Sequence, residues 1–361
     1  MKLEDFDYEL PASSIAQEPA DRRDSSRLMV LDRSTGQSDA RGFSDIVEYL
    51  RPGDVLVLNN ARVYPARVRY RRPGGGDGEV LFLEPLSNSP TSPRIPRVAH
   101  SWEVLLRPAK WARKQERVSL AGAVDLEIVE DLGAGRFEVV VRREGRELDS
   151  SEVVELCESV GEMPLPPYIK RGSQDGRSAL DGERYQTVFA NEACAAAAPT
   201  AGLHFTRELL DALVLQGVEV VEVTHQVGLG TFLPLRDDTL LSESLHSEWS
   251  HIDECAAGKV LAAKREGRRV VAVGTTCVRA LESFAKANTP VPYQARTELF
   301  IRPGFEFQIV DALLTNFHLP CSSLLLLVSA FAGREKILGT YERAVELGFR
   351  FYSYGDAMLI L

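Results

Sequence analysis

The sequence has few cysteines and no long apolar run, and each scarcity excludes a class of protein. Five cysteines among 361 residues are odd in number, widely separated and without a Cys-x-x-Cys pair, which excludes a disulfide framework and a zinc knuckle. The longest apolar stretch, residues 324–332, is far short of the roughly 20 residues that cross a bilayer. Acidic residues within positions 4–7 stand where a secretory signal would be basic. We therefore expect a cytoplasmic protein that does not associate with membranes.

Positive charge is scarce overall but concentrated in one segment. The net charge is −10, yet residues 61–120 contain 12 Lys and Arg against 5 Asp and Glu, whereas the rest of the chain has 30 against 47. Such a segment has either solvated arginines on the outer faces of strands or a surface that contacts phosphates. Charge alone does not decide between the two.

The pattern of apolar residues predicts an interrupted α/β chain, and 361 residues with 44% apolar content suffice for two domains. Strand-like runs at 27–31 and 54–58 flank a helix-like stretch at 43–50. Short strands punctuated by glycine and proline follow at 66–70, 79–83, 102–106, 124–129 and 137–141, a texture typical of a small barrel or sandwich. After residue 148 helices and strands alternate again.

The sequence therefore predicts a discontinuous α/β domain with a mixed sheet, residues 1–61 and 152–361, and an inserted small antiparallel β-barrel-like domain, residues 62–151. In the later part, Thr206 and Asp253 are expected to cap helices that end near Gly217 and Gly267. The β-branched runs that follow, residues 218–223 and 270–273, are typical of buried strands.

Three turns in the second half of the chain combine hydroxyl, glycine and imidazole or amide groups. They span residues 198–206 (APTAGLHFT), 224–232 (THQVGLGTF) and 314–320 (LTNFHLP). A hydrophobic core rarely needs so many polar groups in such turns. We therefore expect the three to form one composite small-molecule site.

Two glycine-containing turns have alternative interpretations. The turn Gly274-Thr275-Thr276 follows an apolar strand and begins a helix that carries Arg279, so it either binds an anion or hydroxyls or simply caps the helix. Gly228 and Gly230 lack the third glycine of a dinucleotide-binding turn, which excludes that cofactor site but allows close approach to a flat ligand.

Five of the six histidines, residues 204, 225, 246, 251 and 318, lie in the later part of the chain. No pair has the one-turn helical spacing of a zinc motif, so we expect no metal. Histidines in the polar turns are candidates for touching a substrate. Three carboxylates, Asp311, Glu298 and Glu248, stand near these turns and are possible general bases.

Together these segments closely resemble the S-adenosylmethionine:tRNA ribosyltransferase-isomerase family of the queuosine pathway. The matching stretches are residues 6–11 (FDYELP), 23–28 (RDSSRL), 52–60 (PGDVLVLNN), 62–67 (RVYPAR), 164–169 (PLPPYI), 184–190 (RYQTVFA), 198–205 (APTAGLHF), 274–279 (GTTCVR), 315–320 (TNFHLP) and 354–359 (YGDAML). Residues 69–151 match loosely. Gln226 occupies a position where the family usually has histidine, with His225 beside it.

The resemblance implies an α/β domain with an inserted β-barrel-like domain, and it implies the reaction. The ribosyl part of S-adenosylmethionine is transferred to 7-aminomethyl-7-deazaguanine at the wobble position of tRNA and isomerised, which gives epoxyqueuosine and releases adenine and methionine. S-adenosylmethionine is then a consumed substrate rather than a cofactor or methyl donor, and the partner is a tRNA that carries this base.

On this reading, proton transfer or substrate orientation is assigned to His204 and His318, with Asp311 as an alternative base. The residues expected around the sulfonium substrate are Thr200, Gly202, Gln226, Gly228, Gly230, Thr231, Thr275, Arg279 and Asn316. The cations expected to hold the anticodon stem-loop are Arg62, Arg67, Arg69, Arg71, Lys170 and Arg171.

Two rival functions remain open at the level of the sequence. An S-adenosylmethionine-dependent tRNA methyltransferase is disfavoured because the chain lacks the glycine-rich fingerprint of that class. A non-catalytic tRNA-binding protein would retain the pocket without turnover. The absence of coiled-coil heptads favours a monomer.

Overall fold

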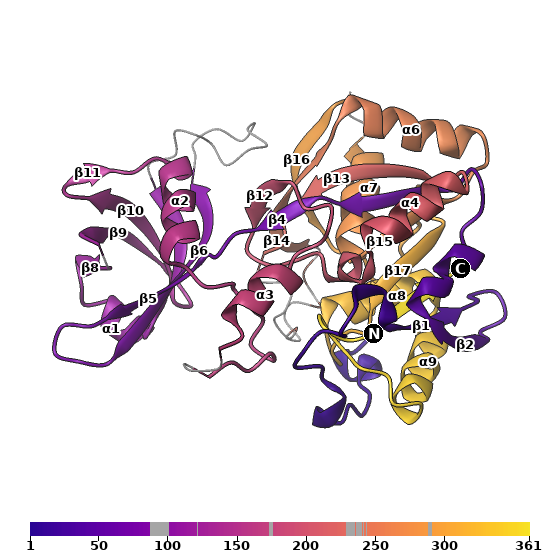
Figure 1. Ribbon diagram of the computed structural model, residues 1–361, viewed down its shortest axis with the longest axis horizontal. Helices are drawn as coiled ribbons and strands as arrows, with labels where there is room; N and C mark the ends of the chain where they lie inside the picture. The colour runs from indigo at the N-terminus through magenta and orange to yellow at the C-terminus, as the bar shows by residue number, and fades with distance from the viewer. Residues whose placement is uncertain are drawn as a thin grey trace.

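The described residues build two larger sheets, one mixed and one curled and antiparallel, and a small two-stranded sheet (Figure 1). The computed structural model describes residues 1–361 except 87–100, 121, 173–175, 229–234, 236–239, 241, 243 and 288–290. A mixed α/β fold with a large mixed sheet agrees with the fold class predicted from the sequence.

The large sheet has nine strands, and helices cover both of its faces. Its strands are, in spatial order, β16 (Tyr293–Leu299), β14 (Ser244–Ile252), β13 (Glu219–His225), β3 (Val55–Asn59), β15 (Val270–Val273), β17 (Ala312–Asn316), β18 (Ala357–Ile360), β1 (Arg27–Leu31) and β2 (Ser38–Gly42). The four central strands β13, β3, β15 and β17 run parallel, so their carboxyl ends meet at one edge of the sheet.

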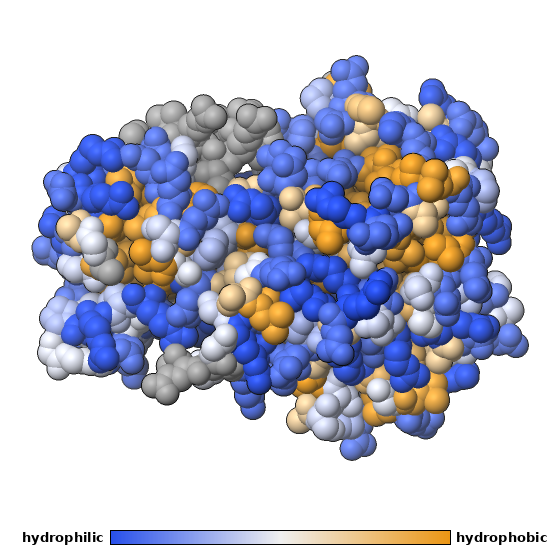
Figure 2. All heavy atoms as spheres, viewed as in Figure 1, coloured by the Kyte–Doolittle hydropathy of each residue, from blue (hydrophilic) through white to orange (hydrophobic). Residues whose placement is uncertain are grey.

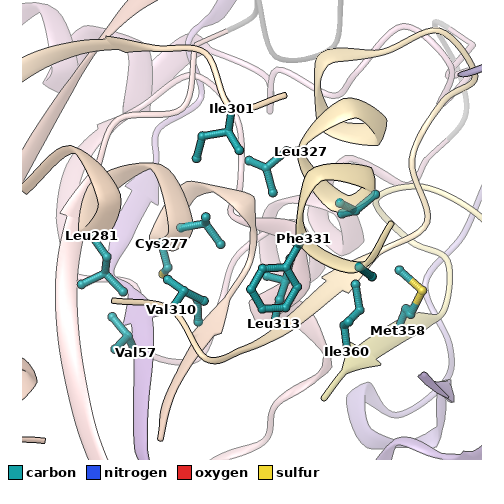
Figure 3. Packing of buried hydrophobic residues seen from close by; sticks show 14 of the residues in the cluster. Val57, Cys277, Leu281, Ile301, Val310, Leu313, Leu327, Phe331, Met358 and Ile360 are labelled. Carbon is teal, nitrogen blue, oxygen red and sulfur yellow. The ribbon is translucent and has the colours of Figure 1, made fainter. Parts of the chain in front are cut away.

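Both faces of the central strands are buried, which explains their continuous apolar sequence. Val55 and Val57 belong to one hydrophobic core, and Leu56 and Leu58 belong to the other. On the first face, strand residues meet α7 and α8 (Figure 3). The second core is closed by α4 and the 3-10 helix η4.

The α-helices associated with this sheet are α3 (Ser178–Arg184), α4 (Arg207–Leu215), α6 (Glu254–Arg265), α7 (Thr275–Ala287), α8 (Ser323–Ala332) and α9 (Arg334–Glu346). The 3-10 helices are η1 (Leu3–Phe6), η2 (Ala12–Ser14), η3 (Arg23–Ser25), η4 (Phe43–Glu48) and η5 (Thr200–His204). The predicted caps are confirmed: Thr206 Oγ1 accepts from Leu209 N at 3.1 Å, and Asp253 Oδ1 accepts from Ala256 N at 2.7 Å.

The second sheet is antiparallel and has its own hydrophobic core. Its elements are β5 (Arg67–Arg71), β6 (Asp77–Leu86), β7 (Ser101–Arg107), α1 (Ala109–Ala112), β8 (Arg117–Ser119), β9 (Val124–Gly133), β10 (Arg136–Arg143), β11 (Arg146–Glu147) and α2 (Ser150–Val160). The order β5-β6-β7-β10-β9-β8 is an open path among the described residues, since no ladder joins β5 to β8 there. The sheet is therefore curled but not a closed barrel in this part of the chain.

The helix α2 packs against the inserted sheet, because Val153, Leu156 and Cys157 belong to its hydrophobic core. That packing extends the inserted unit beyond the expected boundary at residue 151. Where the chain returns, β12 (Glu192–Ala195) pairs with β4 (Ala61–Val63) in a two-stranded parallel sheet. This small sheet lies between the two larger bodies in the view of Figure 1.

Hydrophilic residues cover much of the face seen in Figure 2, with apolar residues gathered in smaller areas. Over the ranges that the structure describes, no helix is both long and apolar enough to pass through a membrane.

One buried carboxylate fixes the segment that leads into β17, and it gives a test of the fold. The side chain of Glu282 is fully buried and accepts hydrogen bonds from the backbone N–H groups of residues 308, 309 and 310 at 2.9 to 3.0 Å.

In Glu282→Gln an amide N–H₂ would face these donors, so we expect a loss of about 2 kcal/mol in the free energy of unfolding, measured in urea. The exposed Glu346→Gln should change it by less than about 0.5 kcal/mol. Equal stabilities would contradict this account.

Candidate active site

A pocket of about 600 Å³ lies at the edge where the central parallel strands end. All three polar turns contribute to it, as predicted, through residues 198–201, Val227 and residues 315–319. The start of α7, the start of α8 and the segment around Tyr352 and Ser353 complete its wall. Mostly apolar walls with a few convergent hydroxyl and amide groups are typical of a small-molecule site.

Asn316, the last residue of β17, joins two of the turns. Thr200 Oγ1 donates to Asn316 Oδ1 at 2.8 Å, and Asn316 Nδ2 lies 3.1 Å from His204 Nε2. Because the amide nitrogen donates, His204 Nε2 accepts, and its Nδ1–H is directed at Ser26 Oγ at 2.7 Å. The imidazole is thereby held neutral in one tautomer. Burial, and then the charges of Arg350 and Arg23, lower the pKa of His204 to about 3.

His318 lines the pocket itself. Its Nε2 lies 2.9 Å from Thr315 Oγ1, its backbone N–H donates to Tyr341 Oη, and its carbonyl accepts from Tyr8 Oη. The side chain is more than nine-tenths buried, and burial lowers the pKa of His318 to about 3. His318 therefore offers a neutral, fixed imidazole to whatever occupies the pocket.

The turn before α7 presents backbone N–H groups to the pocket. Gly274 has a φ of +89°, a conformation that favours glycine, and α7 begins at Thr275. Thr275 and Thr276 line the pocket, and within the described structure Thr276 Oγ1 is buried without a hydrogen-bond partner. A helix N-terminus with an unused hydroxyl can receive a carboxylate or hydroxyl groups.

A second, smaller pocket of about 360 Å³ adjoins the first and shares Thr275, Thr276 and Leu324 with it. Glu248 of β14 lies at its wall with Arg279 and His246. One oxygen of the carboxylate accepts from Gly228 N at 2.9 Å and from His246 Nε2 at 3.1 Å. The other accepts from Arg279 and from His225 Nε2 at 3.0 Å.

This buried network keeps Glu248 ionised. Burial alone would raise the pKa of Glu248, but the Arg279 charge and the hydrogen bonds from His225 and His246 hold it well below its usual range. His225 is fully buried, and burial lowers its pKa despite the neighbouring carboxylate. His246 is about one-third exposed; since its Nε2–H donates to Glu248, its Nδ1 is an acceptor for which the described residues show no donor.

The structure brings many of the expected substrate-binding residues together, but not all of them. Thr200, Thr275, Asn316 and His318 line the main pocket, and Arg279 lines the adjoining one. Gly228 contacts the second pocket through its hydrogen bond to Glu248. Gly230 and Thr231 lie outside the described residues.

Gly202 and Gln226 lie near the pocket without lining it. A Cβ on Gly202 would come within 2.6 Å of Phe189 and 2.9 Å of Thr187, so this glycine permits close packing of η5. The backbone N–H of Gln226 donates to Trp249 O at 2.8 Å, which extends the pairing of β13 with β14. The neighbouring His225, not Gln226, directs an imidazole at Glu248.

The assignment of Asp311 as an alternative base is corrected by the structure. Asp311 precedes β17 and lies at the end of that strand opposite to Asn316, on the order of 16 Å away along an extended chain. Its carboxylate accepts from Lys264 Nζ at 2.7 Å and from Val270 N at 2.8 Å. Asp311 therefore fixes the start of β15 and does not reach the pocket.

Most of the expected RNA-binding cations have carboxylate partners. Arg62 pairs with Glu158, Arg69 with Glu162 and Arg71 with Asp77, all at the surface. Arg67 donates to the carbonyl of Leu165, and Lys170 is exposed. Exposed ion pairs of this kind are weak and can exchange partners.

Arg171 differs from the other five cations and is corrected. Its guanidinium forms a two-pronged contact with Asp181 at 2.6 and 2.9 Å; Asp181 is buried and Arg171 is mostly covered. Breaking such a pair would leave a buried carboxylate uncompensated. Arg171 therefore anchors the segment before α3 and is not available to a nucleic acid.

Sequence reasoning underrated His246 and missed Tyr168, Tyr352 and Ser353. The two tyrosine rings stack with centroids 4.5 Å apart, and Tyr168 Oη lies 2.6 Å from Ser353 Oγ. A possible signal for His246 was its spacing of two residues from Glu248, which places both on one face of a strand. The tyrosines lie in segments far apart in the chain, so spacing carried no such signal.

Comparisons with known proteins relate the chain to a single protein family. Residues 3–360 match a family model described as "Queuosine biosynthesis protein". The S-adenosylmethionine:tRNA ribosyltransferase-isomerases of Carboxydothermus hydrogenoformans and Syntrophotalea carbinolica are each 49% identical to it, over 100% of both chains. A crystal structure of S-adenosylmethionine tRNA ribosyltransferase from Thermotoga maritima is 34% identical, with a TM-score of 0.55 over 99% of this chain and 100% of that one.

The lowered pKa of His318 predicts a dependence of stability on pH. The unfolded histidine takes up a proton near pH 6.5 whereas the folded one does so only near pH 3, so stability is greatest above pH 6.5 and falls as the pH drops towards 3. Between pH 7 and pH 5 the loss should be about 2 kcal/mol for this group. Urea unfolding of His318→Gln should show that much less pH dependence than the parent, whatever its stability at pH 7. Parallel pH profiles for the two proteins would contradict the prediction.

Proposed function

The chain belongs to the queuosine biosynthesis protein family and is a transferase, and we propose that its pocket transfers and isomerises the ribosyl part of S-adenosylmethionine. The acceptor is the amine of 7-aminomethyl-7-deazaguanine at the wobble position of tRNA. The amine nitrogen becomes bonded to the ribosyl-derived carbon skeleton, and adenine and methionine leave, giving epoxyqueuosine. The observation that carries the proposal is the composite pocket at the carboxyl ends of the strands.

The chemistry of the pocket supports a sulfonium nucleoside as the substrate. The stacked Tyr168 and Tyr352 rings offer aromatic faces, which attract a positively charged sulfonium. The N-terminus of α7 with Thr275 and Thr276 suits the carboxylate of the methionine part or the ribose hydroxyls. Glu248 is ionised beside the pocket, but the charge of Arg279 balances it, so the aromatic faces are the feature that favours a positively charged substrate.

The reaction needs a base, because a proton must leave the 5′ carbon beside the sulfonium. A base is most effective when its pKa lies near the working pH. His204 and His318 have a pKa of about 3, which suits neutral hydrogen-bonding partners better than proton acceptors. We therefore assign substrate orientation to His318 and assign to His204 the positioning of Asn316, which His204 contacts through Nε2.

His246 with Glu248 is our candidate for the base. The carboxylate accepts the Nε2–H of His246, which orients the ring, leaves Nδ1 free and stabilises the imidazolium that forms when a proton arrives. Arg279 and His225 hold the carboxylate in place from its other oxygen. The pocket that His246 lines adjoins the substrate pocket, because Thr275 and Thr276 line both.

The tRNA would reach the pocket as a single-stranded loop, whose unstacked wobble base can enter without opening a duplex. We retain Arg62, Arg67, Arg69, Arg71 and Lys170 as contacts to its phosphates, because their surface ion pairs or exposure leave them able to bind an anion. We also propose that the protein acts in the cytoplasm as a monomer. The large apolar residues exposed in the described structure are few and scattered along the chain, which favours the monomer.

The decisive experiment identifies the products of the reaction. Incubation with S-adenosylmethionine and tRNA carrying 7-aminomethyl-7-deazaguanine should release adenine and methionine in equal amounts, measured by chromatography, with tRNA lacking the aminomethyl base as the control. S-adenosylhomocysteine as the product would instead identify a methyltransferase. Binding of tRNA without any product would identify a non-catalytic binding protein.

Alanine substitution of two histidines of β14, one at a time, tests whether His246 is the general base. His246→Ala should lower kcat by about a hundredfold or more while the dissociation constant of S-adenosylmethionine changes little, since the loss of a general base acts on the chemical step. The matched control is His251→Ala. His251 stacks on Trp249 and lines a different pocket, one outside the two pockets of the candidate site. If His246→Ala turns over within threefold of the parent, His246 is not the base.

A further inference from the structure

A small cavity of about 270 Å³, separate from the two pockets above, is lined by three arginines. Arg23 comes from η3, Arg184 from the end of α3, and Arg350 from the segment before β18. These three elements are far apart in the sequence and converge beside His204 and Tyr354. We call this the arginine cavity.

The three guanidiniums are held in place mainly by backbone carbonyls. Arg23 donates to the carbonyls of residues 203 and 183 at 3.2 and 3.0 Å. Arg184 donates to those of residues 21 and 20 at 3.1 and 2.6 Å, and Arg350 donates to that of residue 18 at 3.4 Å. Carbonyl oxygens orient a guanidinium without neutralising it, so the positive charges remain fixed around the cavity.

Little negative charge compensates these cations. In the part of the chain that the structure describes, Arg23 and Arg184 form no ion pair, and Arg350 has only Asp356 at 3.6 Å. The pKa values of two groups reflect the excess of positive charge. Burial and then the charge of Arg184 lower the pKa of Arg23, although the Glu183 carboxylate acts in the opposite direction, and Arg350 and Arg23 add to the burial that lowers the pKa of His204. By contrast, Arg62 of β4 and the β5 residues Arg69 and Arg71 each have a carboxylate partner.

The arginine cavity adjoins the substrate pocket. Ser353 lines both, and His204, which lines the cavity, contacts Asn316 of the pocket through its Nε2. A nucleotide whose base enters the pocket would therefore carry a backbone phosphate close to the three arginines. In the view of Figure 1, α3, which ends at Arg184, lies on the side of the large sheet that faces the inserted sheet.

We propose that the arginine cavity binds a phosphodiester of the tRNA next to the base that reacts. The inference rests on the proposed function for the source of the anion. It adds Arg23, Arg184 and Arg350 as the cations that set the register of the anticodon loop in the pocket. Planar guanidiniums in a converging arrangement suit the oxygens of a phosphate better than ammonium groups do.

The methionine carboxylate is the other oxyanion within reach, and charge argues against it. S-adenosylmethionine carries a sulfonium, an ammonium and one carboxylate, so its net charge is positive and the excess positive charge of the three arginines would repel it. A phosphodiester carries only negative charge. The helix N-terminus at Thr275 and Thr276 already offers the carboxylate a site inside the main pocket.

Direct binding of the RNA tests the proposal without turnover. An anticodon stem-loop should bind about tenfold more weakly to Arg23→Gln and to Arg350→Gln, the loss expected for one hydrogen-bonded charge pair. The slope of log affinity against log salt should flatten by about 0.7 for each phosphate contact that is lost in a single-stranded region. The dissociation constant of S-adenosylmethionine, measured by dialysis without RNA, should stay within twofold of the parent.

Matched variants make the result interpretable. Arg22→Gln removes a neighbouring exposed arginine that pairs with Asp24, and it should leave RNA affinity and salt slope unchanged. Arg23→Lys and Arg350→Lys keep the charge, so they should keep most of the salt slope but lose part of the affinity that the planar guanidinium provides. An unchanged salt slope in Arg23→Gln and Arg350→Gln overturns the proposal, and so does an unchanged RNA affinity of the Lys variants where a Gln variant does not fold. So does weaker S-adenosylmethionine binding with unchanged RNA binding, which would place the methionine carboxylate in the cavity. A parent that binds RNA through these arginines but releases no adenine would contradict the proposed function alone.

Discussion

The parallel direction of β13, β3, β15 and β17 is the constraint on which the rest of the structure depends. Because parallel strands end at the same edge, turns that lie more than 100 positions apart in sequence, around Thr200 and Asn316, can share a hydrogen bond. The continuous apolar strands bury both faces of the sheet and leave the polar turns at that edge as the place where a ligand meets backbone N–H groups, hydroxyls and imidazoles.

The buried charges near this edge are compensated in different ways, and the difference has functional meaning. Glu248 receives Arg279, two histidines and a backbone N–H, so the network is satisfied and rigid, and its carboxylate stays ionised although it is buried. The isolated histidines, His204 and His318, have no carboxylate partner in the described structure and are neutral instead. A histidine that is both accessible and backed by a carboxylate is therefore better suited to move a proton than one that is merely buried.

The sequence predicted the elements better than the contacts between them. Strands at 27–31 and 270–273, both helix caps and the convergence of three turns are confirmed, because each follows from local periodicity, capping or strand direction. Asp311 was misplaced because it is close to Asn316 in sequence but not in space. The extended strand β17 lies between them and puts the two residues at opposite ends. Arg171 was misassigned because a count of charges does not show which charges pair. Its pairing with Asp181 results from the packing of α3, which the sequence did not reveal. The position of Gln226 is explained by the strand pairing, which turns His225 and not Gln226 towards Glu248.

The electrostatic layout around the pocket suits the two substrates that we propose. A sulfonium nucleoside with a net positive charge suits a pocket of hydroxyls and aromatic rings beside an ionised carboxylate. A polyanionic RNA suits fixed cations, and these belong outside that pocket, since unpaired arginines within it would repel the sulfonium. The charges differ on the two sides of the pocket: beside α7, Glu248 and Arg279 form an ion pair, whereas Arg23, Arg184 and Arg350 beyond His204 carry an excess of positive charge. The neutral imidazole of His204 stands between them, and its low pKa is what keeps a further positive charge away from the sulfonium side.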